Sequence, residues 1–372
     1  MCRTGKQKGA AGCLAALRFA GAYIAFMSGS GFATGQEVMQ YYVAFGFHGI
    51  ATILLVFALL AYAGARLVAT GHREHFKRGS DVFAYYCGPV IGRFFDWFIT
   101  FAIYMSFVVI LAGAGAAMAQ QFGLPAGAGV AITALLSCVT VIGGFGRMLK
   151  VLGNLGPVII AMVFAVAVVG LARGAGNLAE ADRAIASMQL LRAADFWWLS
   201  AVSYVGISMI WLTTFLTRLG AEAEDGRRAT RGIVLGTAVF FSGVLVMTLA
   251  MMGNISALQG SQVPMLVLAE QLHPAVATAF AMIVSLGIYT ASVPLLWTAT
   301  ARVAGERTRR SRYAVPAAAL VGAVIAMTLS FDRLVNIVYV LCGYVGFFLC
   351  GAVLWKDLRA GYQRLCARSR AC

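Results

Sequence analysis

Ten long apolar stretches alternate with short polar connections along this chain, and each is near or above the length that crosses a bilayer. A transmembrane helix needs about 20 predominantly apolar residues. Of the 372 residues, 61% are hydrophobic and 12% are charged, which is more apolar surface than one soluble core can bury. The pattern predicts an all-α membrane protein with ten transmembrane helices. The expected spans are residues 18–46, 48–70, 94–121, 126–144, 151–172, 196–217, 232–254, 275–301, 313–331 and 334–355.

Basic residues are concentrated in alternate connections between these spans. With the N-terminus inside, 25 of the 29 Lys and Arg residues lie on the inner side, and only Arg173, Arg183, Arg192 and Arg333 lie outside. This asymmetry is the positive-inside rule. The formal charge of +15 therefore reflects membrane topology, and we expect the lipid bilayer as a partner and no nucleic acid. Both termini are expected on the cytoplasmic side.

The chain carries no recognisable metal or catalytic motif. None of its eight cysteines falls in a segment expected outside, so free thiols are the simple expectation. His72 and His75 lack the spacing of a zinc-binding helix, and neither Gly-x-Ser-x-Gly nor His-Glu-x-x-His occurs. We therefore expect a protein that is not an enzyme and that holds no metal or cofactor.

Small polar residues interrupt the middle of two spans that occupy matching places in the chain. Span one contains Ser28 to Gly31 and span six contains Ser203 to Ser208, so that Gly206 follows Gly29 by 177 positions. Because five spans separate the two sites, the halves have opposite orientations in the membrane. We expect one transporter domain over 1–372, built from an inverted repeat of about 14–172 and about 196–355.

Matched interruptions of this kind are the best sequence indication of a binding site in a transporter. A helix broken within the bilayer leaves N–H and C=O groups that lipid cannot satisfy but a polar ligand can. The alternative is close helix packing, which is the usual role of glycine in membrane helices. We expect that packing role for Gly113, Gly115, Gly343 and Gly346, and both roles stay open for Gly29 and Gly31.

Two stretches of span one resemble a known group of transporters. Gly29-Ser30-Gly31-Phe32 resembles the first-span signature of the amino acid/polyamine/organocation superfamily, whose LeuT-type fold is a five-plus-five inverted repeat. The longer run from Gly21 to Glu37 is similar to the first span of the YkvI family of bacterial membrane proteins. The resemblance implies discontinuous helices one and six. It also implies a secondary active transporter of an amino acid or related small solute, working by alternating access in the bacterial cytoplasmic (inner) membrane.

The resemblance further implies which residues form the site. The implied substrate-binding residues are Gly29, Ser30, Gly31, Ser203, Tyr204, Gly206 and Ser208. Tyr104 on span three stands where relatives place a hydroxyl near the substrate, although an ordinary packed tyrosine is the alternative. H⁺ or Na⁺ is the implied coupling ion, and Thr290 and Ser292 on span eight are the candidate sodium ligands. An alanine separates these two, so their side chains point in different directions, and bonding to their own helix is the alternative.

Glu37 is the one carboxylate well inside a span, and an ionised acid there costs about 2.5–3.5 kcal/mol on insertion scales. It follows Gly31 by six residues, or about 9 Å along a helix. Three roles are open for it. It could carry a coupling proton, contact a cationic group on the substrate, or accept hydrogen bonds from span six near Thr213 and Thr214.

Two other classes of function share this architecture. A ligand sensor could retain a transporter fold without transport, because fold alone does not determine function. A membrane-embedded enzyme is the other alternative, although no motif nominates a nucleophile. Liposome assays separate the three through solute accumulation, binding without flux, or chemical conversion. The sequence determines neither the solute nor the oligomeric state.

The basic-residue asymmetry predicts the topology directly. A reporter that is active only outside the cytoplasm should be silent when fused after Cys372 and active when inserted near Gly176. A reporter active only in the cytoplasm serves as the control and should give the opposite pattern. Activity of the first reporter at Cys372 and silence near Gly176 would contradict the expected orientation.

Overall fold

The computed structural model describes residues 16–28, 30–76, 79–143, 155–305 and 308–369, and every regular element in these ranges is a helix. Nine helices in the described ranges are long and apolar enough to cross a membrane, which confirms an all-helical, multi-pass membrane protein. Seven of them are α4 (His48–Glu74), α5 (Asp81–Phe122), α6 (Ala126–Gly143), α10 (Trp197–Ala221), α11 (Gly226–Gly253), α14 (Pro274–Ala304) and α15 (Arg309–Thr328). The other two are Val158–Ser187, which includes most of α8 (Leu155–Gly174), and Phe331–Arg359, which includes much of α17 (Val340–Ser369).

The first expected span, 18–46, is divided into short helices instead of forming one long helix. These are the N-terminal helix (Ala16–Met27), α2 (Ser30–Thr34), α3 (Gln36–Tyr41) and the 3₁₀ helix η1 (Val43–Phe45). Ser28 is not helical, and Gly35 separates α2 from α3 with a φ of 82°, a left-handed conformation that glycine adopts without strain. Gly29 lies outside the described residues, so a complete break at the centre of this span, like the count of ten spans, stays a prediction.

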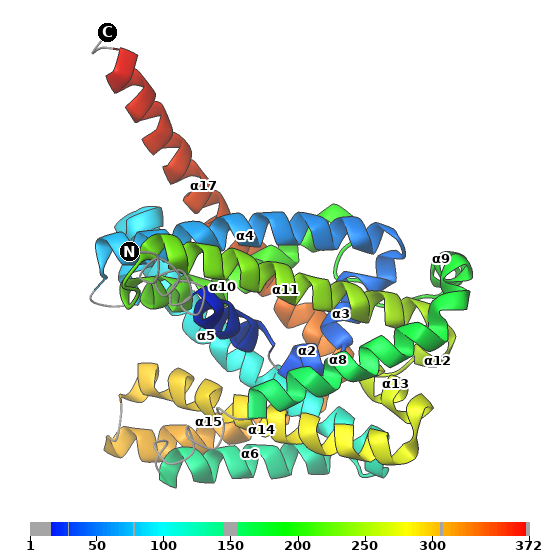
Figure 1. The fold of residues 1–372 in the computed structure, drawn as a ribbon. Helices are drawn as coiled ribbons and strands as arrows, with labels where there is room; N and C mark the ends of the chain where they lie inside the picture. The colour runs from blue at the N-terminus through cyan, green and yellow to red at the C-terminus, as the bar shows by residue number, and fades with distance from the viewer. Residues whose placement is uncertain (1–15, 29, 77–78, 144–154, 306–307, 370–372) are drawn as a thin grey trace, which may run out of the picture.

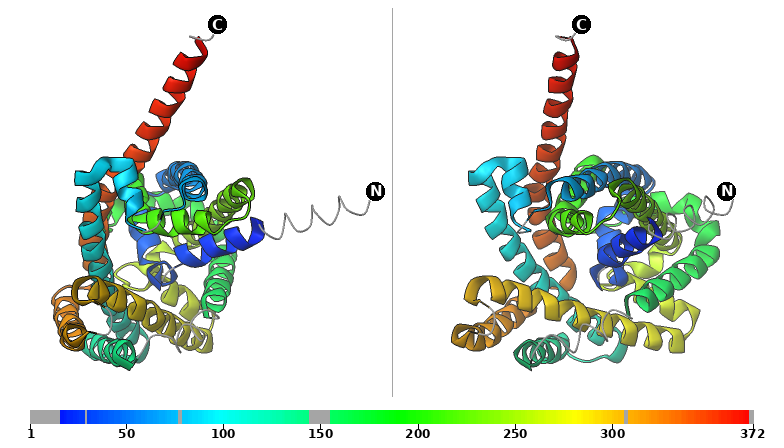
Figure 2. Two further views of the ribbon diagram at one scale, coloured as in Figure 1. Left: turned by 90° about the vertical axis from the view of Figure 1, so that its left-hand side faces the viewer. Right: turned by 60° about the vertical axis from the view of Figure 1, so that its left-hand side comes forward.

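The long helices form two groups that lie on opposite sides of the first span (Figure 1). One group contains α4, α10 and α11, and the other contains α5, α6, α14 and α15. Each group takes helices from both halves of the chain, as expected when two repeats intertwine. α17 packs against α10 and continues beyond the bundle at its C-terminal end (Figure 2).

The predicted break in span six is absent, because α10 is one uninterrupted helix from Trp197 to Ala221. Gly206 and its neighbours instead allow a close approach to α17. A Cβ on Gly206 would lie 1.7 Å from the carbonyl oxygen of Gly343, and one on Gly346 would lie 2.1 Å from the carbonyl oxygen of Gly206. These glycines are therefore packing residues that bring two helix backbones into contact. That role was predicted for Gly343 and Gly346 and was missed for Gly206.

Short elements cap the two ends of the bundle. α9 (Leu178–Ser187), α12 (Ile255–Leu258) and α13 (Pro264–Leu272) lie together at one end. At the other end α5 begins at Asp81 and bends at Gly88, where φ is 81° and Pro89 follows. The segment from Asp81 to Gly88 thus forms a short helical arm.

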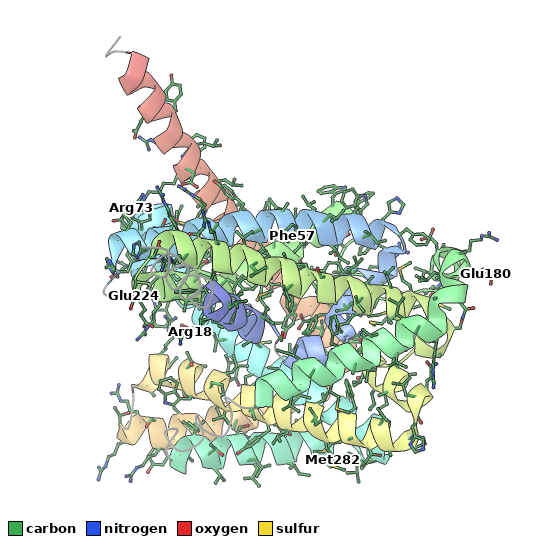
Figure 3. The ribbon with its side chains drawn as sticks, in the orientation of Figure 1. Arg18, Phe57, Arg73, Glu180, Glu224 and Met282 are labelled. Atoms are coloured by element: carbon green, nitrogen blue, oxygen red, sulfur yellow. The ribbon has the colours of Figure 1, made fainter. Side chains whose placement is uncertain are left out.

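Charged side chains distinguish the two ends (Figure 3). Arg18, Arg73 and Glu224 lie at the end where α5 begins, and Glu180 lies at the opposite end. We call the end where α5 begins the basic end. Among the described cysteines, Cys87, Cys138, Cys342 and Cys350 are free thiols.

The contact at Gly206 predicts a sharp response to a single methyl group. Gly206→Ala should destabilise the protein by about 1–3 kcal/mol, because the new Cβ overlaps backbone atoms that cannot move independently. Gly21→Ala is the matched control, since nothing lies within 4 Å of a Cβ at that position. Thermal unfolding in detergent measures both variants. Equal melting temperatures for wild type and Gly206→Ala would contradict the packing interpretation.

Candidate functional site

The carboxylate of Glu37 folds back over Gly31, across the turn that Gly35 makes between α2 and α3. A Cβ on Gly31 would lie 2.1 Å from Oε1 of Glu37 and 3.5 Å from the hydroxyl of Tyr339. The carboxylate therefore occupies the space that any side chain at position 31 would need. The hydroxyl of Thr34 donates a 2.7 Å hydrogen bond to the carbonyl of Gly31 and stabilises this short turn.

Tyr339 reaches Gly31 from the other end of the chain because the helix that carries it is locally wider. α16 (Phe331–Leu334) continues into α17 through the π-helix η4 (Val335–Tyr339). Such π-helical turns are rare and occur frequently at functional sites. On the same turn Asn336 donates a 3.1 Å hydrogen bond to Oε1 of Gln40, and Gln40 donates one of 2.8 Å to the carbonyl of Asp332. α3 is thereby fixed to η4 and α16.

Four tyrosines lie in the neighbourhood of Glu37. Tyr41, Tyr42, Tyr204 and Tyr339 all lie close enough to interact electrostatically with its carboxylate. The ring centroids of Tyr41 and Tyr204 are 5.2 Å apart in an edge-to-face arrangement, and those of Tyr42 and Tyr204 are 5.3 Å apart. Tyr41 and Tyr42 are fully buried. We call Glu37 and these four residues the tyrosine cluster.

Further aromatic rings extend the tyrosine cluster towards α2. Phe241 on α11 lies 6.4 Å from Tyr204 and 5.3 Å from Phe240, measured between ring centroids. Phe240 lies 5.0 Å from Phe32, which follows Gly31 on α2. The interrupted first span is thus lined by aromatic rings on the side that faces α10 and α11.

Two buried hydroxyls lie at the tyrosine cluster. That of Tyr42 interacts with Tyr204, and that of Ser106 interacts with Tyr339. Glu37 and Gly31 are partly accessible, whereas the chain neighbours of Glu37 are buried.

No basic side chain neutralises this carboxylate within the described ranges. The ion pairs found there join other residues, most of them at the basic end, and none includes Glu37. An acid within a membrane protein that faces the bundle interior without a basic partner is a functional-site candidate.

Several residues predicted from the sequence do come together here. Tyr204 is a member of the tyrosine cluster, and the Ser203 hydroxyl lies 3.5 Å from that of Tyr41. Ser30 is the first residue of α2, and the carboxylate of Glu37 lies against Gly31. Gly29 lies outside the described residues. Gly206 faces α17, and Ser208 is buried on the same helix, α10.

Other predicted residues point elsewhere in this structure. Tyr104 donates a 3.0 Å hydrogen bond to the carbonyl of Ala318 on α15. The hydroxyl of Ser292 lies 2.6 Å from that of Ser137 on α6, and Thr290 bonds to the carbonyl of Gly287 on its own helix at 2.7 Å. The binding role of Tyr104 and the sodium-site roles of Thr290 and Ser292 stay predictions. The contact of Tyr104 agrees with the alternative of an ordinary packed tyrosine. The contact of Thr290 agrees with the alternative of bonding to its own helix.

The sequence interpretation missed three members of the tyrosine cluster. Tyr41 and Tyr42 follow Glu37 by about one helical turn, so two adjacent hydroxyls within a span near an acid were an available signal. Tyr339 offered no such signal. Its place depends on a π-helix and on how α17 packs, and neither is visible in a pattern of local residues.

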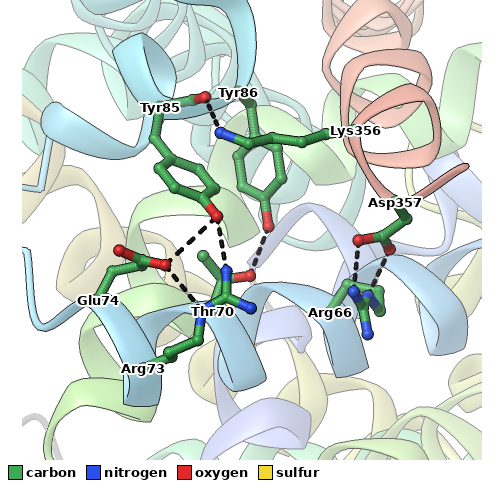
Figure 4. Close-up of polar contacts among 8 residues, drawn as sticks. All are labelled: Arg66, Thr70, Arg73, Glu74, Tyr85, Tyr86, Lys356 and Asp357. Carbon is green, nitrogen blue, oxygen red and sulfur yellow. Dashed lines mark hydrogen bonds and ion pairs between the residues drawn. The ribbon is translucent and has the colours of Figure 1, made fainter. Parts of the chain in front are cut away.

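A second polar group joins α4 to α17 at the basic end (Figure 4). Arg66 on α4 forms an ion pair with Asp357 on α17, and Tyr62 donates a 2.7 Å hydrogen bond to the same carboxylate. Because these side chains are only partly buried, the pair contributes little stability, about 0–1 kcal/mol. Such contacts can break and re-form when helices shift.

The arm of α5 takes part in the same group (Figure 4). Tyr86 donates a 2.8 Å hydrogen bond to Thr70 on α4, and Arg73 donates one of 2.6 Å to the hydroxyl of Tyr85. The Lys356 ammonium of α17 lies 3.0 Å from the centroid of the Tyr85 ring, a cation–π contact. Elements from both helix groups are therefore connected here by polar contacts.

A cavity of about 310 Å³ opens at the basic end beside the N-terminal helix. Its lining includes Arg18, Glu224 and Asp225. The backbone N–H groups of Arg228 and Arg227 hold the pKa of Asp225 below its usual range, so this carboxylate is ionised at neutral pH.

One face of the N-terminal helix leads from this cavity towards the tyrosine cluster. Arg18, Gly21 and Ala25 are exposed, and Ser28 at the end of that helix is partly exposed. These residues recur every three to four positions and therefore share one helix face. They form an accessible track from the basic end to the interruption before α2.

No protein-family model matches the chain. It is 25% identical over 334 residues to the uncharacterized membrane protein YkvI of Bacillus subtilis strain 168, which covers 90% of this chain and 94% of that protein. The predicted resemblance to YkvI is confirmed. The uncharacterized protein YyaD of the same organism is 20% identical over 331 residues, covering 88% of this chain and 92% of YyaD.

Solved structures identify the fold. MhsT in complex with L-phenylalanine superposes with a TM-score of 0.60 at 14% identity, over 90% of this chain and 87% of MhsT. A mutant of the Eremococcus coleocola manganese transporter superposes with a TM-score of 0.54 at 14% identity, over 91% and 77% of the two chains. The fold is that of the LeuT-type transporters.

The accessible track predicts a difference between two serines in a background without native cysteines. Ser28→Cys should react with a water-soluble thiol reagent added on the basic side, because Ser28 is partly exposed at the end of the track. Ser200→Cys is the matched control and should stay unreactive, because Ser200 is fully buried and donates to the carbonyl of Tyr41. Mass spectrometry of the labelled protein measures both. Equal labelling of the two cysteines would contradict the track.

Proposed function

We propose that this protein is a secondary active transporter that moves a small organic solute across the membrane by alternating access, driven by an H⁺ or Na⁺ gradient. The observation that carries the proposal is the interruption of the first span beside a partly accessible carboxylate that no described basic residue neutralises. Within a LeuT-type fold, irregular backbone between the repeats is where a solute binds.

Burial of the tyrosine cluster supports movement during the transport cycle. Tyr41 and Tyr42 are fully buried, so a solute reaches them only if surrounding helices separate. The two helix groups meet around the first span, and at the basic end partly exposed polar contacts connect them. Contacts of this kind cost little to break, which suits an element that opens and closes.

The chemistry of the cluster favours an organic solute over a metal ion. The manganese transporter found in the comparison acts on a metal, and MhsT was solved with an amino acid. Manganese prefers several carboxylate, carbonyl and water oxygens. Here one carboxylate lies among aromatic rings, an environment that matches an amino acid or a related small molecule.

The experiment is uptake by the purified protein in liposomes. Radiolabelled amino acids and small amines are offered in mixtures, with an inward pH gradient, an inward sodium gradient, or neither. Accumulation that needs one gradient supports coupled transport. Binding without flux would instead indicate a sensor, and chemical conversion of the solute would indicate an enzyme.

Gly31→Ala tests the site within the same assay. Its Cβ would overlap the carboxylate of Glu37 and displace it, so uptake should fall by at least about tenfold, equivalent to about 1.4 kcal/mol in the transport step. Gly21→Ala, which adds the same methyl group in open space, should keep wild-type uptake. Melting temperatures confirm that both variants are folded. Unchanged uptake by Gly31→Ala would contradict a site at this interruption.

A further inference from the structure

We propose that the C-terminal part of α17, from Trp355 to Ser369, is an amphipathic helix that binds the membrane surface at the basic end through its lipid interior and its anionic headgroups. The inference goes beyond the proposed transport function and does not depend on it, because it concerns a surface outside the helix bundle. It rests on the direction of this segment, its apolar face and its charge.

The first argument is the direction in which the helix leaves the bundle. The red C-terminal part of α17 departs obliquely at the basic end, while the long helices of both groups run across the view (Figure 1). The left view of Figure 2 looks onto the basic end, and there α4, α6 and α15 are seen close to end-on. In that view the end of α17 is seen along its length, beyond the bundle. A helix that runs sideways from the ends of membrane spans lies along the interface between lipid and water.

The second argument is a row of exposed apolar side chains on this helix. Trp355, Leu358 and Tyr362 are 70%, 68% and 70% exposed. They are spaced three and four residues apart, so they share one helix face. Exposed apolar patches mark interaction surfaces, and Trp and Tyr are enriched where lipid meets water.

The opposite face of the same helix is held by the bundle. Asp357 forms the ion pair with Arg66, and Lys356 lies over the ring of Tyr85 (Figure 4). These two residues follow Trp355 directly and therefore lie about 100° and 200° around the helix from it. The apolar row thus faces away from the bundle, where it is available to lipid or to another protein.

The third argument is positive charge, which distinguishes between these two partners. Arg359 is exposed one helical turn after the start of the apolar row, and Arg364 and Arg368 follow in the same helix. Asp357 is the one acidic residue in the sequence of this segment, and it already pairs with Arg66. An apolar face bordered by arginines is attracted to anionic lipid. A second copy of the same helix would bring like charges together.

The test measures the depth of single side chains in a bilayer. Tyr362→Cys and Gln363→Cys, each in the full chain without its native cysteines, are spin-labelled and reconstituted in nanodiscs. Both positions are exposed, so the label has room at either one. The measured quantity is the accessibility of the label to oxygen, which concentrates in lipid, divided by its accessibility to a water-soluble nickel chelate. This ratio should be severalfold higher at position 362 than at the control position 363, which is turned about 100° away from it.

Lipid charge tests the electrostatic part of the inference. The ratio at position 362 should be higher in nanodiscs that contain phosphatidylglycerol than in those of phosphatidylcholine alone, because the arginines draw the helix to anionic headgroups. Arg359→Gln should reduce this difference. Arg312→Gln, which removes an exposed charge at the start of α15, is the matched control and should leave it unchanged.

Three results would overturn the inference. Equal ratios at positions 362 and 363 would show that the helix does not lie with its apolar face in lipid. A ratio at position 362 that does not respond to phosphatidylglycerol would exclude anionic headgroups as the partner. Spin–spin broadening between labels at position 362 of two chains in one nanodisc would show that a second copy covers the apolar row.

Discussion

Lipid cannot accept or donate hydrogen bonds, and the architecture of this chain depends on that constraint. Every backbone group within the bilayer must be paired inside the protein, so long helices are the default. The first span departs from this default at Ser28 and Gly35 and therefore needs other partners. The hydroxyl of Thr34 donates a hydrogen bond to the carbonyl of Gly31, and the side-chain amide of Gln40 donates one to the carbonyl of Asp332 on α16. The irregular segment can exist because side chains and neighbouring helices enclose it.

Close helix contact positions the residues that enclose it. α10 and α17 approach until the backbone at Gly206 touches that at Gly343 and Gly346, with no room for a side chain. The π-helix η4, which carries Tyr339, directly precedes α17 and also contacts α10, which carries Tyr204. The hydroxyl of Tyr339 lies near Gly31. Packing of α17 against α10 therefore helps to place Tyr339 and Tyr204 in the same part of the bundle.

Glu37 shows how a costly residue can be placed by local chain geometry. The turn at Gly35 separates α2 from α3, and a carboxylate six residues along the chain lies against Gly31 instead of about 9 Å away along a straight helix. Partial accessibility moderates the cost of burying its charge, and none of the ion pairs among the described residues includes it.

The amino-acid sequence by itself determined the membrane class, nine of the expected spans and the uneven distribution of basic residues along the chain. Whether a segment lies in lipid or in water depends on its own hydropathy and charge, so these features can be predicted from the local sequence. Only the tertiary structure decided whether Gly206 breaks a helix or packs one, and where Tyr104, Ser292 and Tyr339 direct their hydroxyls. Those outcomes depend on which backbone lies opposite each residue, and that partner comes from a segment distant in the sequence.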